Sequence, residues 1–241
     1  MIYAILTTLT LLCVTFTAIS GQHSRRYFEK QQPKSQDLQE GPYFYDVEAI
    51  NERRTEFGIH PMILGRRSLR QMSGEEMSDQ ELYPLFEAAK WAPSHFNTQE
   101  WRFVYAKRNT KHWKKYLALL SPGNQEWAKD AAALVVMVSN RFSTYKGKKS
   151  FVRSHSFDAG AAWMALALEA ASRGYVVHAM AGFDYPKAAR AIRMPNNGEY
   201  SVEVMVAIGK RQQYRGRTGE KTSDRKSIDE FVAEGYFSPR F

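Results

Sequence analysis

The segment Phe157–Arg173 constrains the fold more than any other part of the chain. Its sequence, FDAGAAWMALALEAASR, is rich in small apolar residues and predicts a helix, and Gly174 supplies a typical C-terminal stop. Apolar residues lie on nearly every face of this helix. A helix of that kind is buried in a core or in an interface between chains. Other elements must therefore cover it on several sides.

Further segments supply the covering layers. Ser78–Glu81 predicts a capping box, and apolar residues follow it at the spacing of an amphipathic helix. Pro84 is expected to kink or weaken that helix. Apolar runs of strand length follow at residues 101–106, 132–139, 175–179 and 202–208, with a short helix at 185–192 between the last two. This order predicts a layered domain of the mixed α/β or α+β class.

The N-terminal segment has a different composition from the rest of the chain. Residues 2–20 are nineteen positions without a charge, and as a helix they would span ~28 Å, close to the ~30 Å core of a bilayer. Ala18 and Ser20, followed by Gly21, also suit the small-residue cleavage site of an export signal. Because cations follow the run, at Arg25 and Arg26, and none precedes it, we favour a membrane anchor with the folded domain facing the cytoplasm. Export after signal cleavage is the alternative.

Three regions follow from this reading. Residues 1–24 form the anchor or signal segment, and residues 25–44 form a linker that is poor in core-forming side chains. Residues 45–241 form one compact domain, long enough to bury a substantial core.

Charge and cysteine content exclude several classes of protein. The chain carries 34 Lys and Arg against 25 Asp and Glu, a net charge of +9. Its cations are scattered and follow no nucleic-acid-binding motif, so we predict no nucleic-acid partner. The single cysteine, Cys13, excludes an intramolecular disulfide and a cysteine-based zinc site. The histidines lack the spacing of metal ligands, and no metal site is predicted.

The hexapeptide Gly65–Arg70, GRRSLR, places three guanidiniums and a hydroxyl close together. In an extended segment Arg66, Ser68 and Arg70 point to one side, and the guanidinium fork matches phosphate oxygens. This pattern fits a phosphate clamp. A solvated basic turn is the alternative, and the hexapeptide taken alone favours that turn over the clamp.

The loop Trp91–Trp101, WAPSHFNTQEW, is rich in neutral hydrogen-bonding side chains. Such a loop suits a planar ring system edged with carbonyls and nitrogens. It also suits a turn that merely joins a helix to a strand. His95 and Phe96 within it either line a substrate pocket or pack locally.

The order of these motifs resembles the FMN-dependent nitroreductase family. RRSLR is followed by a helix and then by AAKWAPSHFNTQEWRFVYA, and the long helix opens with DAGAA. Further matches are MAGFD after the next strand, IG at the end of the last strand, and RKSI near the C-terminus. The resemblance covers about residues 62–234. Glu100 and Ser227 stand where the family pattern has proline.

The resemblance implies a fold and an assembly. The expected fold is α+β, a three-layer α-β-α arrangement whose central sheet is mixed and mostly antiparallel. The domain 45–241 would bind FMN at the interface of a homodimer, with residues from both subunits. The buried helix at 157–173 resembles the family's central dimer helix.

The resemblance also implies the residues that bind FMN. The phosphate and ribityl chain would be held by Arg66, Arg67, Ser68, Arg70 and Arg225. The isoalloxazine would lie along a loop that includes Pro93, Ser94 and Asn97. Backbone of Ala181 and Gly182 would face the N5 edge of the flavin, where glycine permits a close approach.

The implied reaction is ping-pong exchange through one pocket. NAD(P)H would reduce FMN, and a nitroaromatic, quinone or related small acceptor would take the electrons. No side chain is assigned as a catalytic acid or base. Two alternatives stay open: a membrane-anchored reductive dehalogenase resembling iodotyrosine deiodinase, and a non-enzymatic flavin-binding protein.

Overall fold

The computed structural model describes residues 41–212 and 220–237. Its helices are α2 (Val47–Glu52), α3 (Pro61–Gly65), α4 (Asp79–Lys90), α5 (Trp113–Leu117), α6 (Pro122–Ala128), α7 (His155–Ser172) and α8 (Tyr185–Ala191), with two 3₁₀ turns, η1 (His95–Asn97) and η2 (Ile228–Glu230). Its strands are β1 (Trp101–Lys107), β2 (Ala133–Asn140), β3 (Phe142–Tyr145), β4 (Lys148–Phe151), β5 (Tyr175–Met180) and β6 (Tyr200–Lys210). The predicted segment 1–24 and most of the predicted linker lie outside these residues.

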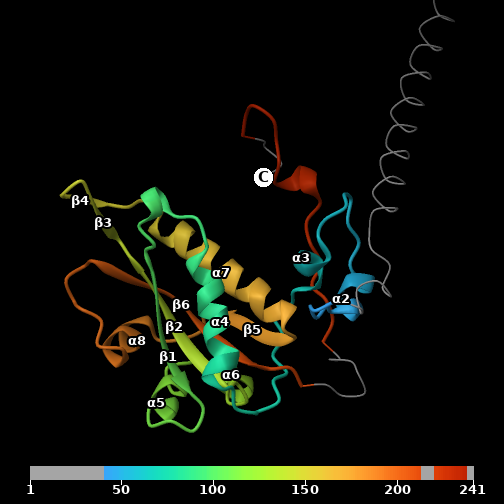
Figure 1. Ribbon diagram of the computed structural model, residues 1–241, viewed down its shortest axis with the longest axis horizontal. Coiled ribbons are helices and arrows are strands. Elements are labelled where there is room, and N and C mark those ends of the chain that lie inside the picture. The colour runs from blue at the N-terminus through green and yellow to red at the C-terminus, as the bar shows by residue number, and fades with distance from the viewer. Residues whose placement is uncertain (1–40, 213–219, 238–241) are drawn as a thin grey trace, which may run out of the picture.

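The main sheet has four strands in the order β1-β2-β6-β5 (Figure 1). Each neighbouring pair in it is antiparallel. Strands β3 and β4 form a separate hairpin. Strand β2 is buried along nearly its whole length, which requires a layer of helices on both faces of the sheet.

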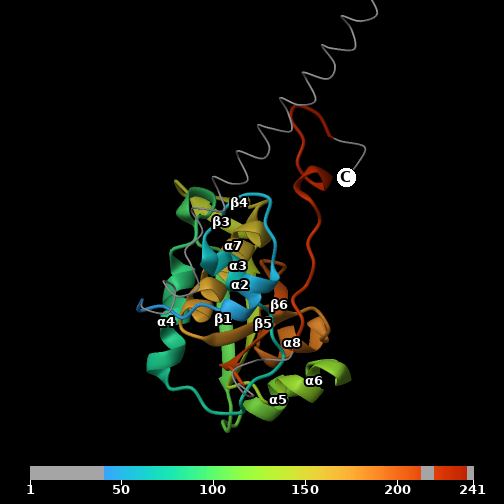
Figure 2. The same cartoon turned by 90° about the vertical axis from the view of Figure 1, so that its right-hand side faces the viewer.

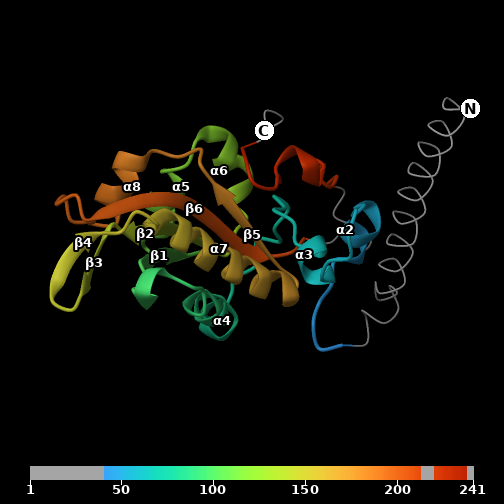
Figure 3. The same cartoon turned by 90° about the horizontal axis from the view of Figure 1, so that it is seen from above.

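Helices cover both faces, so the fold is a three-layer α-β-α arrangement (Figure 3). Helices α4 and α7 pack on one face, where Val135 and Met137 of β2 join their core. Helices α5, α6 and α8 cover the other face, where Leu134 and Val136 point. The alternation along β2 follows from the two-residue period of a strand. The fold class predicted from sequence is confirmed.

Helix α7 is buried along one side only within a single chain. Ala162, Leu166 and Ala170 are buried in the core, whereas Trp163 is half-buried and Phe157 is 81% exposed. The apolar character that the sequence shows on nearly every face is therefore only partly accounted for by contacts with the described residues of this chain. The remaining apolar side is available to a second surface.

Helix α4 begins at the predicted capping box. The backbone N–H of Ser78 donates to Glu81 Oε2 at 2.8 Å, and Ser78 Oγ accepts the Glu81 N–H at 3.3 Å. The hydrogen bond from the Ser78 backbone, aided by Lys210, lowers the pKa of Glu81 to about 2. The helix runs through Pro84 without interruption.

Replacing Ser78 with alanine is expected to lower the free energy of unfolding by about 1 kcal/mol, because the Glu81 N–H in the first turn loses the hydroxyl that accepts its hydrogen bond. Urea unfolding measures this, with the exposed Ser150→Ala as a control. Equal midpoints for the two variants would show that the capping box contributes nothing.

Several short elements lack a signal in the sequence. Helices α2, α3, α5 and α6 are only five to seven residues long, too short to display an apolar period. Residues 146 and 147 form the turn of the β3–β4 hairpin, which the sequence analysis does not predict. Lys146 and Gly147 both have positive φ there, 48° and 78°, as a tight hairpin turn demands.

The predicted membrane anchoring has to be corrected. Within residues 41–212 and 220–237, no helix combines the length and apolar character that crossing a bilayer requires. The uncharged run at 2–20, on which the prediction rested, lies outside the described part of the chain. We therefore withdraw the assignment of the protein to a membrane with its domain facing the cytoplasm.

Candidate functional site

The segment after α3 is extended, and its side chains alternate between two sides. Arg67 and Leu69 are buried, while Ser68 and Arg70 are exposed and Arg66 is half-buried. The Arg66 guanidinium donates to Ser68 Oγ at 3.2 Å. The two-residue period therefore puts Arg66, Ser68 and Arg70 on the outer side, as the sequence pattern predicts.

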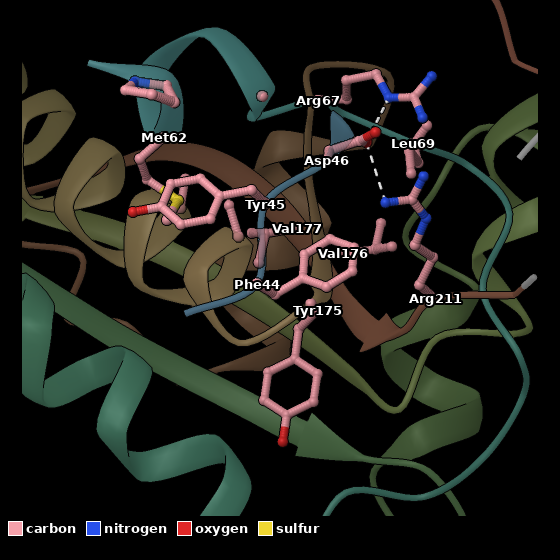
Figure 4. A pocket seen from close by; sticks show the side chains of 15 residues that line it. Phe44, Tyr45, Asp46, Met62, Arg67, Leu69, Tyr175, Val176, Val177 and Arg211 are labelled. Carbon is pink, nitrogen blue, oxygen red and sulfur yellow. Dashed lines mark hydrogen bonds and ion pairs between the residues drawn. The ribbon is translucent and has the colours of Figure 1, made fainter. Parts of the chain in front are cut away.

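Arg67 points the other way, into a buried network of charges (Figure 4). Its Nε donates to Asp46 Oδ2 at 2.8 Å, and a terminal nitrogen pairs with Glu48 at 2.9 Å. Another donates to the Glu220 carbonyl at 2.9 Å. Arg211 reaches the same Asp46 oxygen at 3.0 Å. The Arg67 donors are thus occupied within the chain, and this residue does not share the outer face of Arg66.

The cavity beside this network is too small for a cofactor. Phe44, Met62 and Tyr175 line it together with Arg67 and Arg211 (Figure 4). Its free volume is about 20 Å³, and a single water needs roughly 10–15 Å³. The network therefore joins the segment around α2 to the rest of the domain rather than forming a ligand site.

A cluster of three arginines lies on the outer side, built from distant parts of the sequence. Burial and the positive charge of Arg225 lower the pKa of both Arg53 and Arg66. Arg53 donates to the Arg66 carbonyl at 3.0 Å, and its buried Nε lacks a hydrogen-bond partner among the described residues. Arg225 comes from the C-terminal segment, which passes α3 (Figures 1 and 2). Guanidiniums that repel one another in a partly buried place are stabilised by an anion.

Ser68 and Arg70 lie close to β5. The His178 ring donates from Nδ1 to the Leu69 carbonyl at 3.1 Å, and burial lowers the pKa of this histidine. The backbone N–H groups of Arg70 and Gln71 both donate to Glu220 Oε1, at 2.8 and 3.0 Å. Glu220 thereby fixes the end of the arginine segment.

Ala181 and Gly182 form an exposed turn where β5 ends. The Gly182 carbonyl accepts the Ser121 N–H at 2.9 Å and the Asn124 amide at 3.0 Å. A Cβ at Gly182 would lie 2.7 Å from Asn124 Nδ2 and 2.9 Å from Ser121 Oγ. Any larger residue at position 182 would therefore displace the Asn124 and Ser121 side chains at the start of α6.

Pro93, Ser94 and Asn97 lie in a strained loop around η1. Phe96, Asn97 and Gln99 have positive φ values of 46°, 58° and 51°. The loop is fixed by buried Asp158, which accepts the His95 N–H at 2.9 Å, and by Ser94 Oγ, which accepts the Gln99 N–H at 3.0 Å. Strain of this kind is typical of functional loops.

The arginine cluster and this loop lie at opposite ends of α7 (Figures 1 and 3). Asp158 in the first turn of α7 holds the loop, whereas Ala171 near the other end packs beside α3. Thirteen residues separate these two positions, about 20 Å along a helix. One chain therefore does not bring the two groups of predicted site residues together.

Sequence comparison identifies the family. The sequence profile described as the Nitroreductase family matches residues 63–124 and 108–210. The chain belongs to the nitroreductase family. Its assignment from sequence to this FMN-dependent family is thereby confirmed, and the protein is an oxidoreductase of the nitroreductase type.

Relatives agree with the assignment. Protein DrgA of Synechocystis is 31% identical over 176 residues, which cover 63% of this chain and 83% of that protein. The oxygen-insensitive NADPH nitroreductase of Helicobacter pylori strain 26695 is 42% identical over 66 residues, 27% of this chain and 30% of that protein. A solved oxidoreductase that contains FMN is 36% identical, with a TM-score of 0.72, and the alignment covers 78% of this chain and 97% of the other.

The sequence analysis did not identify three residues that contact the RRSLR segment of this nitroreductase. Arg53, Asp46 and Glu220 contact the RRSLR segment, but each lies outside it in the sequence. An aspartate at a helix start is the only local signal for Asp46. Its partnership with Arg67, 21 residues later, becomes visible only in three dimensions.

Proposed function

We propose that this nitroreductase binds FMN, takes hydride from NAD(P)H and reduces a nitroaromatic, quinone or related small acceptor in alternating half-reactions. The observation that carries the proposal is the cluster of Arg53, Arg66 and Arg225. Three repelling cations gathered from distant segments suit a ligand with a phosphate group.

The residues on the outer side fit the phosphate and ribityl chain of FMN. Arg66, Ser68, Arg70 and Arg225 would hold the phosphate, and Arg53, with its unpaired buried Nε among the described contacts, would add a further donor. In this proposal Arg67 acts indirectly, because its pairs with Asp46 and Glu48 fix the backbone between Arg66 and Ser68.

The remaining site residues fit a homodimer. Ala181 and Gly182 would present backbone to the flavin edge from the same chain as the arginines. Pro93, Ser94 and Asn97 would come from the second subunit, since the length of α7 separates them from the arginine cluster. The half-buried apolar side of α7 supports association through this helix.

Bound FMN supplies the redox chemistry, accepting hydride and releasing electrons to the acceptor. The chain's own residues would neutralise the phosphate, position the ring through the η1 loop, and admit donor and acceptor in turn. No side chain is assigned as a catalytic acid or base. The Helicobacter pylori relative is named for NADPH, so NADPH is the donor to try first.

The test is a visible absorption spectrum of the purified full-length protein, before and after NADPH or NADH is added without oxygen. We expect flavin bands that bleach with at least one donor and return when a nitroaromatic or quinone is added. Bands that neither donor bleaches would favour a flavin-binding protein without this activity. A colourless protein that does not bind added FMN would overturn the proposal.

A further inference from the structure

Three aromatic rings form an exposed stack between the η1 loop and the β3–β4 hairpin. The His95 ring meets the Phe96 ring edge-on at 4.5 Å, and Phe96 stacks on Tyr145 at 4.7 Å with an interplanar angle of 15°. Phe96 is 66% exposed and Tyr145 is 47% exposed. We call Phe96 and Tyr145 the aromatic platform.

The backbone is strained at the positions that expose the aromatic platform to solvent. Phe96 has a φ of 46°, a conformation that bulky side chains rarely adopt. Lys146, next to Tyr145, has a φ of 48°. Hydrophobic burial favours placing a phenylalanine ring inside the protein, so a strained residue that presents its ring to solvent suggests a functional role.

Positive charge surrounds the platform on the hairpin. Lys146 Nζ lies 5.5 Å from the centre of the Tyr145 ring. Lys148 is directly opposite Tyr145 in the antiparallel register, and therefore stands on the same face of the hairpin. Lys149 stands on the other face and pairs with Glu199. Two exposed ammonium groups are thus left beside the rings.

An unsatisfied hydroxyl lies on the same face. Ser143 precedes Tyr145 by two residues in β3, so both side chains point the same way. Ser143 is 8% exposed, and its Oγ lacks a hydrogen-bond partner among the described residues. The hollow of about 350 Å³ that Ser143 also lines has Thr98, Asn140 and the pair Lys149–Glu199 among its walls, and it is adjacent to the platform rather than lined by Phe96, Tyr145, Lys146 or Lys148.

We propose that the aromatic platform, with Lys146, Lys148 and Ser143, is an acceptor subsite for planar aromatic molecules that carry a negative group. The ring of the acceptor would stack on Phe96 and Tyr145. Its carboxylate, sulfonate or phosphate would meet the two ammonium groups and the Ser143 hydroxyl. This inference rests on the proposed function, because Phe96 lies in the same loop as Ser94 and Asn97.

Equilibrium dialysis of the FMN-loaded protein tests the subsite without turnover. The probes are 4-nitrobenzoate and the neutral 4-nitrobenzamide, which have the same shape and are not reduced when no donor is present. We expect the wild-type protein to bind the benzoate more tightly, with a preference that shrinks as salt is added. The double variant K146Q/K148Q should weaken benzoate binding about two- to fivefold for each lysine and leave the benzamide unchanged.

Matched variants separate stacking from charge. Phe96→Ala should weaken binding of both probes by about two- to tenfold. Lys114→Gln, which removes an exposed charge from α5 on the other side of the sheet, should alter neither. Benzoate and benzamide binding with equal Kd in the wild type would overturn the inference. So would a shift in sedimentation for Phe96→Ala with both Kd values unchanged, because the platform would then be an interface between copies.

The proposed function is tested separately. If NAD(P)H fails to reduce the flavin while the benzoate preference persists, the redox proposal fails and the binding subsite stands. If the flavin is reduced and reoxidised by both probes at equal rates, and both bind equally, the subsite fails and the redox function stands.

Discussion

Alanine at Arg66 or at Arg225 is expected to weaken FMN binding by about 10- to 100-fold, because each change removes a charge-assisted contact to the phosphate. The double variant should bind more weakly still, although neighbouring effects need not add. Titration of FMN fluorescence with the apoprotein measures the Kd. Arg190→Ala, an exposed arginine of α8, serves as a control and should leave the Kd unchanged.

The Arg66 and Arg225 variants also make a prediction about the free energy of unfolding. Arg225 lowers the pKa of Arg66 and of Arg53 by repulsion, so removing it relieves a conflict in the apoprotein. The free energy of unfolding without FMN should therefore stay the same or rise. A variant that loses both stability and FMN affinity would show instead that these arginines support the fold. An unchanged Kd in a folded variant would contradict the phosphate site.

Asp46→Ala should be the most destabilising of the substitutions considered. Its carboxylate pairs with two buried guanidiniums, Arg67 at 2.8 Å and Arg211 at 3.0 Å, and also caps α2 through the Ala49 N–H at 3.1 Å. Removing one partner from a buried ion pair costs about 3–5 kcal/mol, and Glu48 would be left as the only carboxylate among the described residues that pairs with the two guanidiniums in this network. Urea unfolding should show this loss, and FMN binding should weaken because the Arg66–Ser68 backbone is no longer fixed.

The matched control for Asp46 is Asp130→Asn. Asp130 pairs with Lys129 at 2.9 Å, and both side chains are well exposed. Surface pairs of this kind contribute about 0–1 kcal/mol. If Asp46→Ala were no more harmful than Asp130→Asn, the buried network would not be what holds the segment around α2 against the domain.

Arg66 and Arg67 are neighbours in the hexapeptide GRRSLR, but their charges have different roles. Arg67 finds acidic partners in the segment that precedes it, and its charge is compensated within the chain. Arg66 meets Arg53 and Arg225 instead, so its charge adds to theirs. One buried face thus stabilises the fold, while the opposite face concentrates positive charge for a ligand.

Long elements could be predicted from the sequence because their periods are long enough to read. The capping box at Ser78 marks the start of α4, and apolar runs mark β1, β2, β5 and β6. Alternation in GRRSLR correctly separates Arg66, Ser68 and Arg70 from Arg67. Short helices and the β3–β4 hairpin escaped prediction, since their stability comes from tertiary packing more than from local propensity.

The sequence by itself determined the family, the layered order of helices and strands, and the outward direction of three residues in the arginine segment. Local periodicity and capping carry that information. Only the tertiary structure decided which charges are compensated, that Arg53 and Arg225 join Arg66, and that Phe96 stacks on Tyr145. Those outcomes depend on contacts between distant segments, and no local pattern encodes the partner of a side chain that the fold brings near from far along the chain.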